Sequence, residues 1–217
     1  MKVSTQKILD NTMLNYPMLE SCRQQIFQAF LLLQRCFSQG GKVLVCGNGG
    51  SAADSEHIVG ELMKGFLLKR EIPRANIDKF KAAFPDEWQY FAGNLQGALP
   101  AISLVSQTAI ATAFINDIAP DMVFAQLVYG YAREGDVLIG ISTSGNSKNV
   151  VNAIKVARVL GVRSIGLTGK TGGVMKDHCD IVIAVPAIET FRIQELHLPV
   201  YHALCAMLET EFFNNDD

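Results

Sequence analysis

The hydrophobic positions of this chain fall into two patterns that alternate along most of its length. Short apolar runs predict buried strands, and longer stretches with apolar residues three and four positions apart predict helices. We expect strands at 42–46, 101–105, 136–141, 163–168 and 181–185, and helices at 51–66, 107–115, 120–133, 146–160 and 189–213. Buried strands that alternate with amphipathic helices predict an α/β fold, in which a parallel sheet is covered by helices on both faces.

Two segments stand outside this alternation. Residues 6–38 carry apolar side chains at helical intervals and predict one long helix, which Pro17 is expected to break or kink because it has no backbone N–H. Residues 67–99 combine basic and aromatic side chains in an unusually long connection. Such a segment is either a lid or interface element, or a surface excursion with its own small cluster, and both interpretations stay open.

The composition of the whole chain narrows the class of protein. The 217 residues, 49% of them hydrophobic, suffice for a sizeable core, and we expect a single domain over 1–217. A net charge of −2 argues against nucleic acid or a membrane surface as the main partner. Without an apolar stretch of roughly 20 residues or a signal-peptide core, a cytoplasmic protein is expected. Five cysteines without CxxC spacing indicate reduced, mostly buried thiols.

A glycine-rich turn follows the first long apolar run. The sequence Gly47-Asn48-Gly49-Gly50-Ser51 ends a strand and opens a helix, so free backbone N–H groups stand where a phosphate or another anion can bind. Neither GxGxxG nor GxxxxGK[ST] occurs here, which favours a sugar phosphate over a nucleoside triphosphate. On the same helix, His57 and Glu61 are four residues apart and share a face. They predict a metal-binding or acid/base pair about two turns from the anion site.

A second anion-binding turn is predicted after 136–141. The sequence Ser142-Thr143-Ser144-Gly145-Asn146-Ser147 offers several hydroxyl groups and backbone N–H groups at another helix start. Simple helix capping needs only one such residue. Ligands of parallel sheets bind beyond the carboxyl ends of the strands, where both turns belong. Residues 166–173 look superficially like a P-loop but have too few spacer residues between the glycines, and we interpret them as a turn.

The closing helix adds further candidates. Gln194 and His202 are eight residues apart, roughly two turns, and share a face, whereas His197 points elsewhere. Pro199 is expected to kink the helix. Taken alone, His202 has the character of a core or interface histidine. Together with His57 and Glu61 it favours a site for a divalent metal such as zinc, although glutamine is an uncommon zinc ligand.

These residues resemble the SIS (sugar isomerase) family, and within it the bacterial phosphoheptose isomerases. The matching pieces are residues 47–54, His57-x-x-x-Glu61-Leu62, Asn116-Asp117, residues 142–147 and 167–170, and Arg192-Ile193-Gln194-Glu195-x-His197 with His202. The resemblance implies a flavodoxin-like three-layer αβα sandwich with a five-stranded parallel sheet and long N- and C-terminal helices. It also implies a homotetramer.

The same resemblance implies a reaction, a metal and site residues. The reaction is the aldose–ketose isomerisation of D-sedoheptulose 7-phosphate to D-glycero-D-manno-heptose 7-phosphate, in heptose biosynthesis for lipopolysaccharide core or related glycans. One Zn²⁺ per subunit would be held by His57, Glu61, Gln194 and His202. Substrate would contact Asn48, Gly49, Gly50, Ser51, Glu61, Asn116, Asp117, Ser142, Thr143, Ser144, Ser147 and Gln194. Moving a proton between C1 and C2 through an enediol needs an acid/base pair, and our hypothesis assigns it to Glu61 and His202.

Two departures from the family pattern bear on the substrate more than on the reaction class. Residues 67–99 are longer than this connection usually is, and Phe191 stands where an aspartate is common. The alternatives are another SIS sugar-phosphate isomerase, or a non-catalytic SIS protein such as a sugar-phosphate sensor or an adaptor that binds the replication initiator. The presence of all four predicted metal ligands favours the enzyme.

Overall fold

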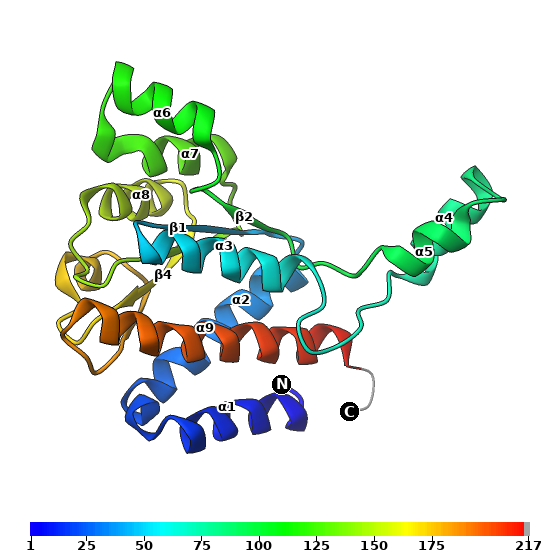
Figure 1. Ribbon diagram of the computed structural model, residues 1–217, viewed down its shortest axis with the longest axis horizontal. Coiled ribbons are helices and arrows are strands. Elements are labelled where there is room, and N and C mark those ends of the chain that lie inside the picture. Colours follow the sequence, from blue (N-terminus) through cyan, green and yellow to red (C-terminus); the bar gives the residue numbers. More distant parts are fainter. Residues whose placement is uncertain (215–217) are drawn as a thin grey trace.

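The computed structural model describes residues 1–214, and its centre is a five-stranded sheet between two layers of helices (Figure 1). The strands are β1 (Val43–Gly47), β2 (Ala101–Ser103), β3 (Val137–Ile141), β4 (Arg163–Thr168) and β5 (Ile181–Ala184). They lie in the order β2-β1-β3-β4-β5, and all neighbours are parallel. This confirms the flavodoxin-like sheet and places the switch in strand order between β1 and β3.

The helices follow the predicted alternation, with bounds shifted by a few residues. They are α1 (Val3–Asn15), α2 (Arg23–Ser38), α3 (Gly50–Met63), α4 (Arg74–Ala83), α5 (Trp88–Asn94), α6 (Thr108–Asp117), α7 (Val123–Tyr131), α8 (Lys148–Val159) and α9 (Thr190–Phe213), with 3-10 turns η1 (Pro17–Cys22), η2 (Pro120–Met122) and η3 (Gly173–Asp177). The long C-terminal helix is confirmed and continues through Pro199. Within residues 1–214, none of these helices has the length and apolar character needed to span a bilayer.

The side chains of the strands divide the core into two layers. Val43 and Val45 of β1 belong to the layer formed with α1, α2, α3 and α9, whereas Leu44 and Cys46 face α7 and α8. Successive side chains of a strand point to opposite faces, and the parallel register keeps side chains of like orientation in one layer. Both faces of the strands are apolar because helices cover both, as a parallel sheet requires.

The N-terminal helix differs from the expectation. Residues 6–38 do not form one long helix, because α1 ends at Asn15 and α2 begins only at Arg23. The turn η1 lies between them and starts at Pro17, which cannot donate an N–H to continue the helix. The break at Pro17 was expected, whereas a continuous helix was wrong. As a result, α1 folds back along α9 while α2 packs under the sheet (Figure 1).

The cysteines are free thiols, as predicted. Cys22, Cys36, Cys46 and Cys205 are buried, and Cys179 is half-buried. Burial raises the pKa of Cys36 to about 11 and that of Cys46 to about 12. Because the thiolate is the reactive form, these residues act as small core side chains at neutral pH.

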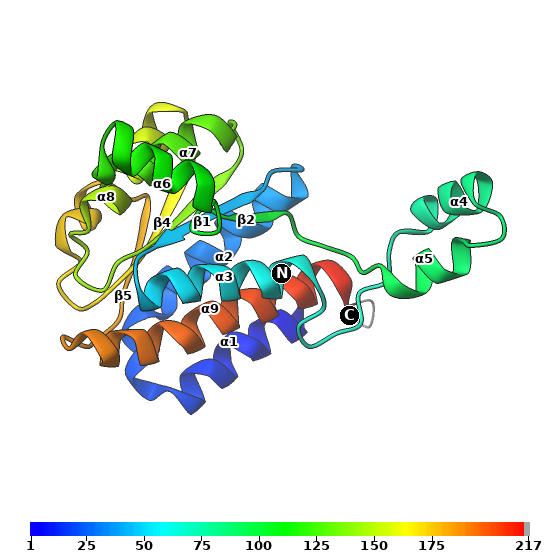
Figure 2. The ribbon, with the colours of Figure 1, turned by 45° about the horizontal axis from the view of Figure 1, so that its top comes forward.

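Residues 71–96, which we call the arm, project from the body as the helices α4 and α5 (Figures 1 and 2). No residue of either helix is buried. The two helices pack on each other: Phe80 stacks on Phe91 with ring centroids 5.1 Å apart, and Lys81 lies 4.5 Å over the ring of Trp88. In this chain the arm is therefore a surface excursion with its own small aromatic cluster.

Replacing residues 74–94 by a short Gly/Ser linker is expected to leave the body folded. The base of the arm is already closed, because Gly97 N donates to the Arg70 carbonyl over 2.9 Å. We expect the melting temperature to change by less than about 4 °C, which corresponds to roughly 1–2 kcal/mol in a chain of this size. Circular dichroism and sedimentation measure both quantities. A loss of about 10 °C or more, together with a change in oligomeric state, would mean that the arm packs on another copy of the chain.

Candidate active site

The turns after β1 and β3 lie side by side at the carboxyl edge of the sheet, where the strand order switches. Asn48 and Asn149 join them, since the side-chain amide of each donates to the side-chain oxygen of the other over 2.9 Å. Gly49 has a φ of +57°, a conformation that glycine adopts without strain, and it turns the chain from β1 into α3. Gly50 and the buried Ser51 then form the first turn of α3.

The serine-rich turn is held in shape by its own hydrogen bonds. The hydroxyl oxygens of Ser142 and Ser147 are 2.9 Å apart, and Ser144 Oγ accepts from the backbone N–H of Asn146 over 3.2 Å. Gly145 has a φ of +67°, and a Cβ there would lie 2.2 Å from the carbonyl oxygen of Gly172. Of residues 166–173, those at 166–168 still belong to β4, and the turn that follows the strand packs against the serine-rich turn. We call residues 48–51 and 142–147 together the cradle. Thr143 is one of its hydroxyl-bearing residues.

Gln194 reaches the cradle from α9. A Cβ at Gly50 would lie 2.3 Å from Gln194 Nε2, so this amide packs directly on the first turn of α3. His202 lies eight residues further along α9, roughly 12 Å by helical rise. Gln194 therefore lies at the cradle, two turns away from His202.

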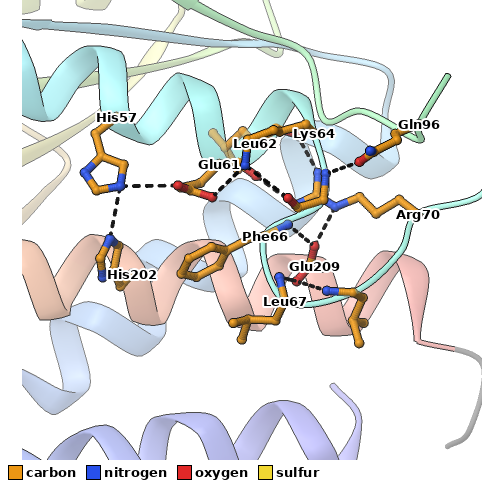
Figure 3. A network of polar contacts seen from close by, with 12 residues as sticks. His57, Glu61, Leu62, Lys64, Phe66, Leu67, Arg70, Gln96, His202 and Glu209 are labelled. Carbon is orange, nitrogen blue, oxygen red and sulfur yellow. Dashed lines mark hydrogen bonds and ion pairs between the residues drawn. The ribbon is translucent and has the colours of Figure 1, made fainter. Parts of the chain in front are cut away.

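Three of the predicted site residues meet further along α3 and α9 (Figure 3). His57 Nε2 is 3.2 Å from Glu61 Oε1 and 3.4 Å from His202 Nε2. The Glu61 side chain is only 13% exposed, whereas that of His57 is 42% exposed. Burial and the neighbouring His57 lower the pKa of His202, which keeps its imidazole neutral and able to accept or donate a proton at neutral pH. We call His57, Glu61 and His202 the acid/base cluster.

A hydrogen-bonded pair orients the ring of His57. The Tyr201 hydroxyl oxygen is 3.1 Å from Asp54 Oδ1 and 3.1 Å from His57 Nδ1. When Tyr201 donates to the Asp54 carboxylate, it accepts from His57 Nδ1–H, and the lone pair of Nε2 then faces the rest of the cluster. Burial raises the pKa of Asp54, and the bond from Tyr201 opposes that shift. Sequence reasoning gave neither residue a role, although Asp54 stands three positions before His57 on one helix face.

The predicted metal ligands divide between these two places. In residues 1–214 no three His, Cys, Asp or Glu side chains surround one point as metal ligands do, although Glu61 and His202 both contact His57 Nε2 (Figure 3). The separations of 3.2 and 3.4 Å nevertheless match those between ligands of tetrahedral zinc, about 3.3 Å for bonds of about 2.0–2.1 Å. The fourth predicted ligand, Gln194, lies at the cradle in this chain.

Asn116 and Asp117 lie at the end of α6, apart from the cradle and the acid/base cluster. The Asn116 amide donates to Asp117 Oδ1 over 2.7 Å, and both side chains are exposed. Over residues 1–214, no hydrogen bond or ion pair joins either of them to another predicted site residue. In this chain the structure does not bring them to the rest of the site.

His197 is separate from the acid/base cluster, as expected from its place on the helix. Its side chain is fully buried at the end of β4. Burial lowers the pKa of His197 to about 4, and within residues 1–214 neither of its buried ring nitrogens has a hydrogen-bond partner. The residue is a neutral core histidine beneath the cradle.

Comparison with known proteins places the chain in a family. SIS domain models match residues 14–82 and 107–209. The phosphoheptose isomerase of Aliarcobacter butzleri is 39% identical over 193 residues, which are 89% of this chain and 88% of that protein. The chain belongs to the phosphoheptose isomerase family. Neither domain match includes residues 83–106, so much of the arm lies outside the SIS pattern.

Solved structures of this family share the fold. The phosphoheptose isomerase of Neisseria gonorrhoeae is 33% identical, with a TM-score of 0.71 over 92% of this chain and 94% of that one. The phosphoheptose isomerase of Francisella tularensis is 29% identical, with a TM-score of 0.74 over 96% and 100%. These matches confirm the SIS fold expected from the sequence.

The burial of neutral His197 predicts a pH dependence of stability. The unfolded chain protonates this residue near pH 6.5, whereas the folded chain does so only near pH 4. The stability that neutral His197 contributes is therefore present above about pH 6.5 and is lost as the pH falls toward 4, by roughly 3 kcal/mol. Urea unfolding between pH 7.5 and 4.5 measures this loss. The variant His197→Gln should lose less stability over that range, and an unchanged slope would contradict the assignment.

Proposed function

We propose that this protein converts D-sedoheptulose 7-phosphate to D-glycero-D-manno-heptose 7-phosphate, for the heptose of lipopolysaccharide core or a related glycan. Membership of the phosphoheptose isomerase family supports an aldose–ketose isomerase. The observation that carries the choice of substrate is the distance between the cradle and the acid/base cluster. The cradle suits a phosphate, since it combines hydroxyl groups with two helix starts.

That distance fits a long sugar phosphate. Gly50 and His57 are seven residues apart on α3, which corresponds to about 10 Å of helical rise. An extended chain advances about 1.2 Å per bond, so the phosphorus of a seven-carbon 7-phosphate, eight bonds from C1, lies about 10 Å from it. In a five-carbon 5-phosphate the same separation is only about 7 Å. A heptose phosphate held in the cradle therefore places C1 and C2 beside the acid/base cluster.

The cluster supplies the groups that the isomerisation needs. A ketose loses a proton from C1 and gains one at C2, while a second proton moves between the two oxygens. We assign the transfer between carbons to the Glu61 carboxylate, which is largely shielded from water. The neutral imidazole of His202 serves the oxygens, since it can both accept and donate. Asp54 and Tyr201 orient His57, which contacts both proton-transfer groups.

We also propose one Zn²⁺ per subunit, with His57, Glu61 and His202 as donors. Nitrogen and carboxylate ligands suit zinc, and the contacts between these side chains have the spacing described above. When bound, the ion would polarise the oxygens on C1 and C2. A carboxylate bound tightly to zinc is a poor base, so either its coordination loosens when substrate binds or the ion is chiefly structural. Because Gln194 lies at the cradle, we assign it to substrate within its own chain. It could join the metal ligands only from another subunit.

We further propose a cytoplasmic homotetramer that has no nucleic acid or membrane as partner. Large apolar side chains remain exposed on the single chain, among them Leu14 at 77%, Met18 at 52% and Ile118 at 69%. Apolar surface of this kind on several elements supports contacts between subunits. Because Asn116 and Asp117 lie beside the exposed Ile118, we propose that they reach substrate held by a neighbouring subunit.

Turnover of sedoheptulose 7-phosphate tests the proposed substrate. We expect kcat/KM for this sugar to exceed that for a five-carbon ketose 5-phosphate by about 100-fold or more, because the shorter chain leaves C1 about 2 Å short of the acid/base cluster. Chelation should lower the rate, and added Zn²⁺ should restore it. Equal rates with both sugars would contradict the length argument. Binding without turnover of either would favour a sensor.

Substitution of the proton-transfer groups tests their roles. Glu61→Gln and His202→Asn should each lower kcat by about 100-fold or more, since positioned acid/base groups contribute that much. The KM should change little because the cradle holds the phosphate. Asn15, which is exposed at the end of α1, provides a control as Asn15→Ala with unchanged kinetics. Near-full activity of either site variant would rule out its role.

A further inference from the structure

Residues 64–70, which we call the strap, connect α3 to the arm and lie over α9 (Figure 3). At the end of the strap, Arg70 forms an ion pair with Glu209 of α9, with Arg70 Nε 2.8 Å from Glu209 Oε1. The Arg70 side chain is 0% exposed and that of Glu209 is 1% exposed. Fully buried charges of this kind occur only where other polar groups also satisfy them.

Glu209 satisfies the backbone of the strap. Its two carboxylate oxygens accept hydrogen bonds from the N–H groups of Phe66, Leu67 and Leu68, over 2.7, 2.6 and 3.1 Å. Together with Arg70 Nε, four donors therefore converge on one carboxylate. This arrangement fixes the path of the strap over α9 residue by residue.

Arg70 satisfies the end of α3 in turn. Its Nη1 donates to the Leu62 carbonyl over 2.7 Å, and its Nη2 donates to the Glu61 carbonyl over 2.8 Å. Carbonyls in the last turn of a helix have no partner within that helix, so a guanidinium can bond two of them at once. Its flat face also lies over the ring of Phe213, 4.9 Å from the centroid. The guanidinium thus ties the backbone of Glu61 itself to α9.

The strap carries side chains that touch the acid/base cluster. The ring of Phe66 packs against the imidazole of His202, with centroids 5.3 Å apart. The Lys64 ammonium lies 3.5 Å from Glu61 Oε2. Both proton-transfer groups are therefore in contact with a segment whose position Arg70 and Glu209 determine.

We propose that Arg70 and Glu209 are positioning residues for the isomerisation. They hold the backbone of Glu61 and, through Phe66, the ring of His202, at the geometry that proton transfer needs. This inference rests on the roles proposed above for Glu61 and His202. A buried ion pair is often no more stabilising than apolar residues of the same volume, whereas its directional bonds specify one geometry. Small displacements of acid/base groups lower the reaction rate strongly, so a fixed geometry favours catalysis.

The variant Arg70→Lys tests the inference with the charge on Glu209 still compensated. A lysine can reach the carboxylate but cannot donate to both helix carbonyls at once. We expect kcat to fall by about tenfold or more, with KM within about threefold of its original value, at a temperature well below unfolding. A second variant, Phe66→Leu, removes the ring that packs on His202 but keeps an apolar side chain against the core, and should lower kcat in the same way while the protein stays folded.

An ion pair far from the strap, between the buried Asp136 and the partly exposed Lys42, provides a control. Asp136 at the amino end of the sheet is 4% exposed, binds Lys42 Nζ at 2.5 Å, and accepts from the backbone N–H groups of Lys42 and Arg133. Asp136→Asn and Arg70→Lys should both lower the melting temperature, but Asp136→Asn should leave kcat unchanged. Equal losses of kcat in the two variants, or an unchanged kcat in Arg70→Lys, would overturn the inference.

A readout that does not depend on turnover separates this inference from the proposed function. The imidazole NMR resonances of His202, assigned with His202→Asn, should shift in Arg70→Lys and Phe66→Leu but not in Asp136→Asn. If Glu61→Gln and His202→Asn keep their activity, the catalytic roles proposed for Glu61 and His202 are wrong. A shift of the His202 resonances in the strap variants would then still show that the strap positions His202. If the resonances stay in place in both strap variants, the strap does not position His202, whatever the activity.

Discussion

The packing of α3 along α9 is the constraint on which the rest of the site depends. The two helices run side by side in the same direction, and three contacts join them at intervals of about two turns. The first is the Gln194 amide on Gly50, and the second is the meeting of His57 with Tyr201 and His202. The third runs from the end of α3 through Arg70 to Glu209. A rigid pair of helices therefore fixes the distance from the phosphate-binding cradle to the acid/base cluster.

The elements of the fold were largely predictable because both faces of its sheet are covered. Strands such as β3 and β4 are then apolar throughout, and the glycine and serine turns that follow strands mark the carboxyl edge. The break at Pro17 shows the limit of periodicity, since apolar spacing continues across a residue that cannot donate its N–H. The site was harder to predict. Helical spacing assigns Gln194 and His202 to one face, but it does not show that Gln194 packs on Gly50 while His202 meets His57.

Arg70 and Glu209 had no signal in the sequence. They are 139 positions apart, and Arg70 stands in a basic stretch beside Lys69 that has the character of a solvated surface. The guanidinium is buried because the strap packs over α9, and this tertiary contact cannot be read from local sequence. The same holds for Tyr201, which looks like an ordinary core residue of α9 until its hydroxyl is seen between Asp54 and His57.

The separation of cradle and cluster also bears on what kind of protein this chain is. A sensor of sugar phosphates needs the cradle, since hydroxyl groups and helix starts suffice to hold a phosphate. It has no need of a largely buried carboxylate beside two imidazoles, one of them oriented by a tyrosine and an aspartate. Shielding ionisable groups from water costs solvation free energy. Ionisable groups in such an environment are typical of sites where protons are transferred. The distance along α3 from the cradle to this cluster matches the length of a seven-carbon sugar phosphate. The arrangement therefore favours an isomerase over a binding protein.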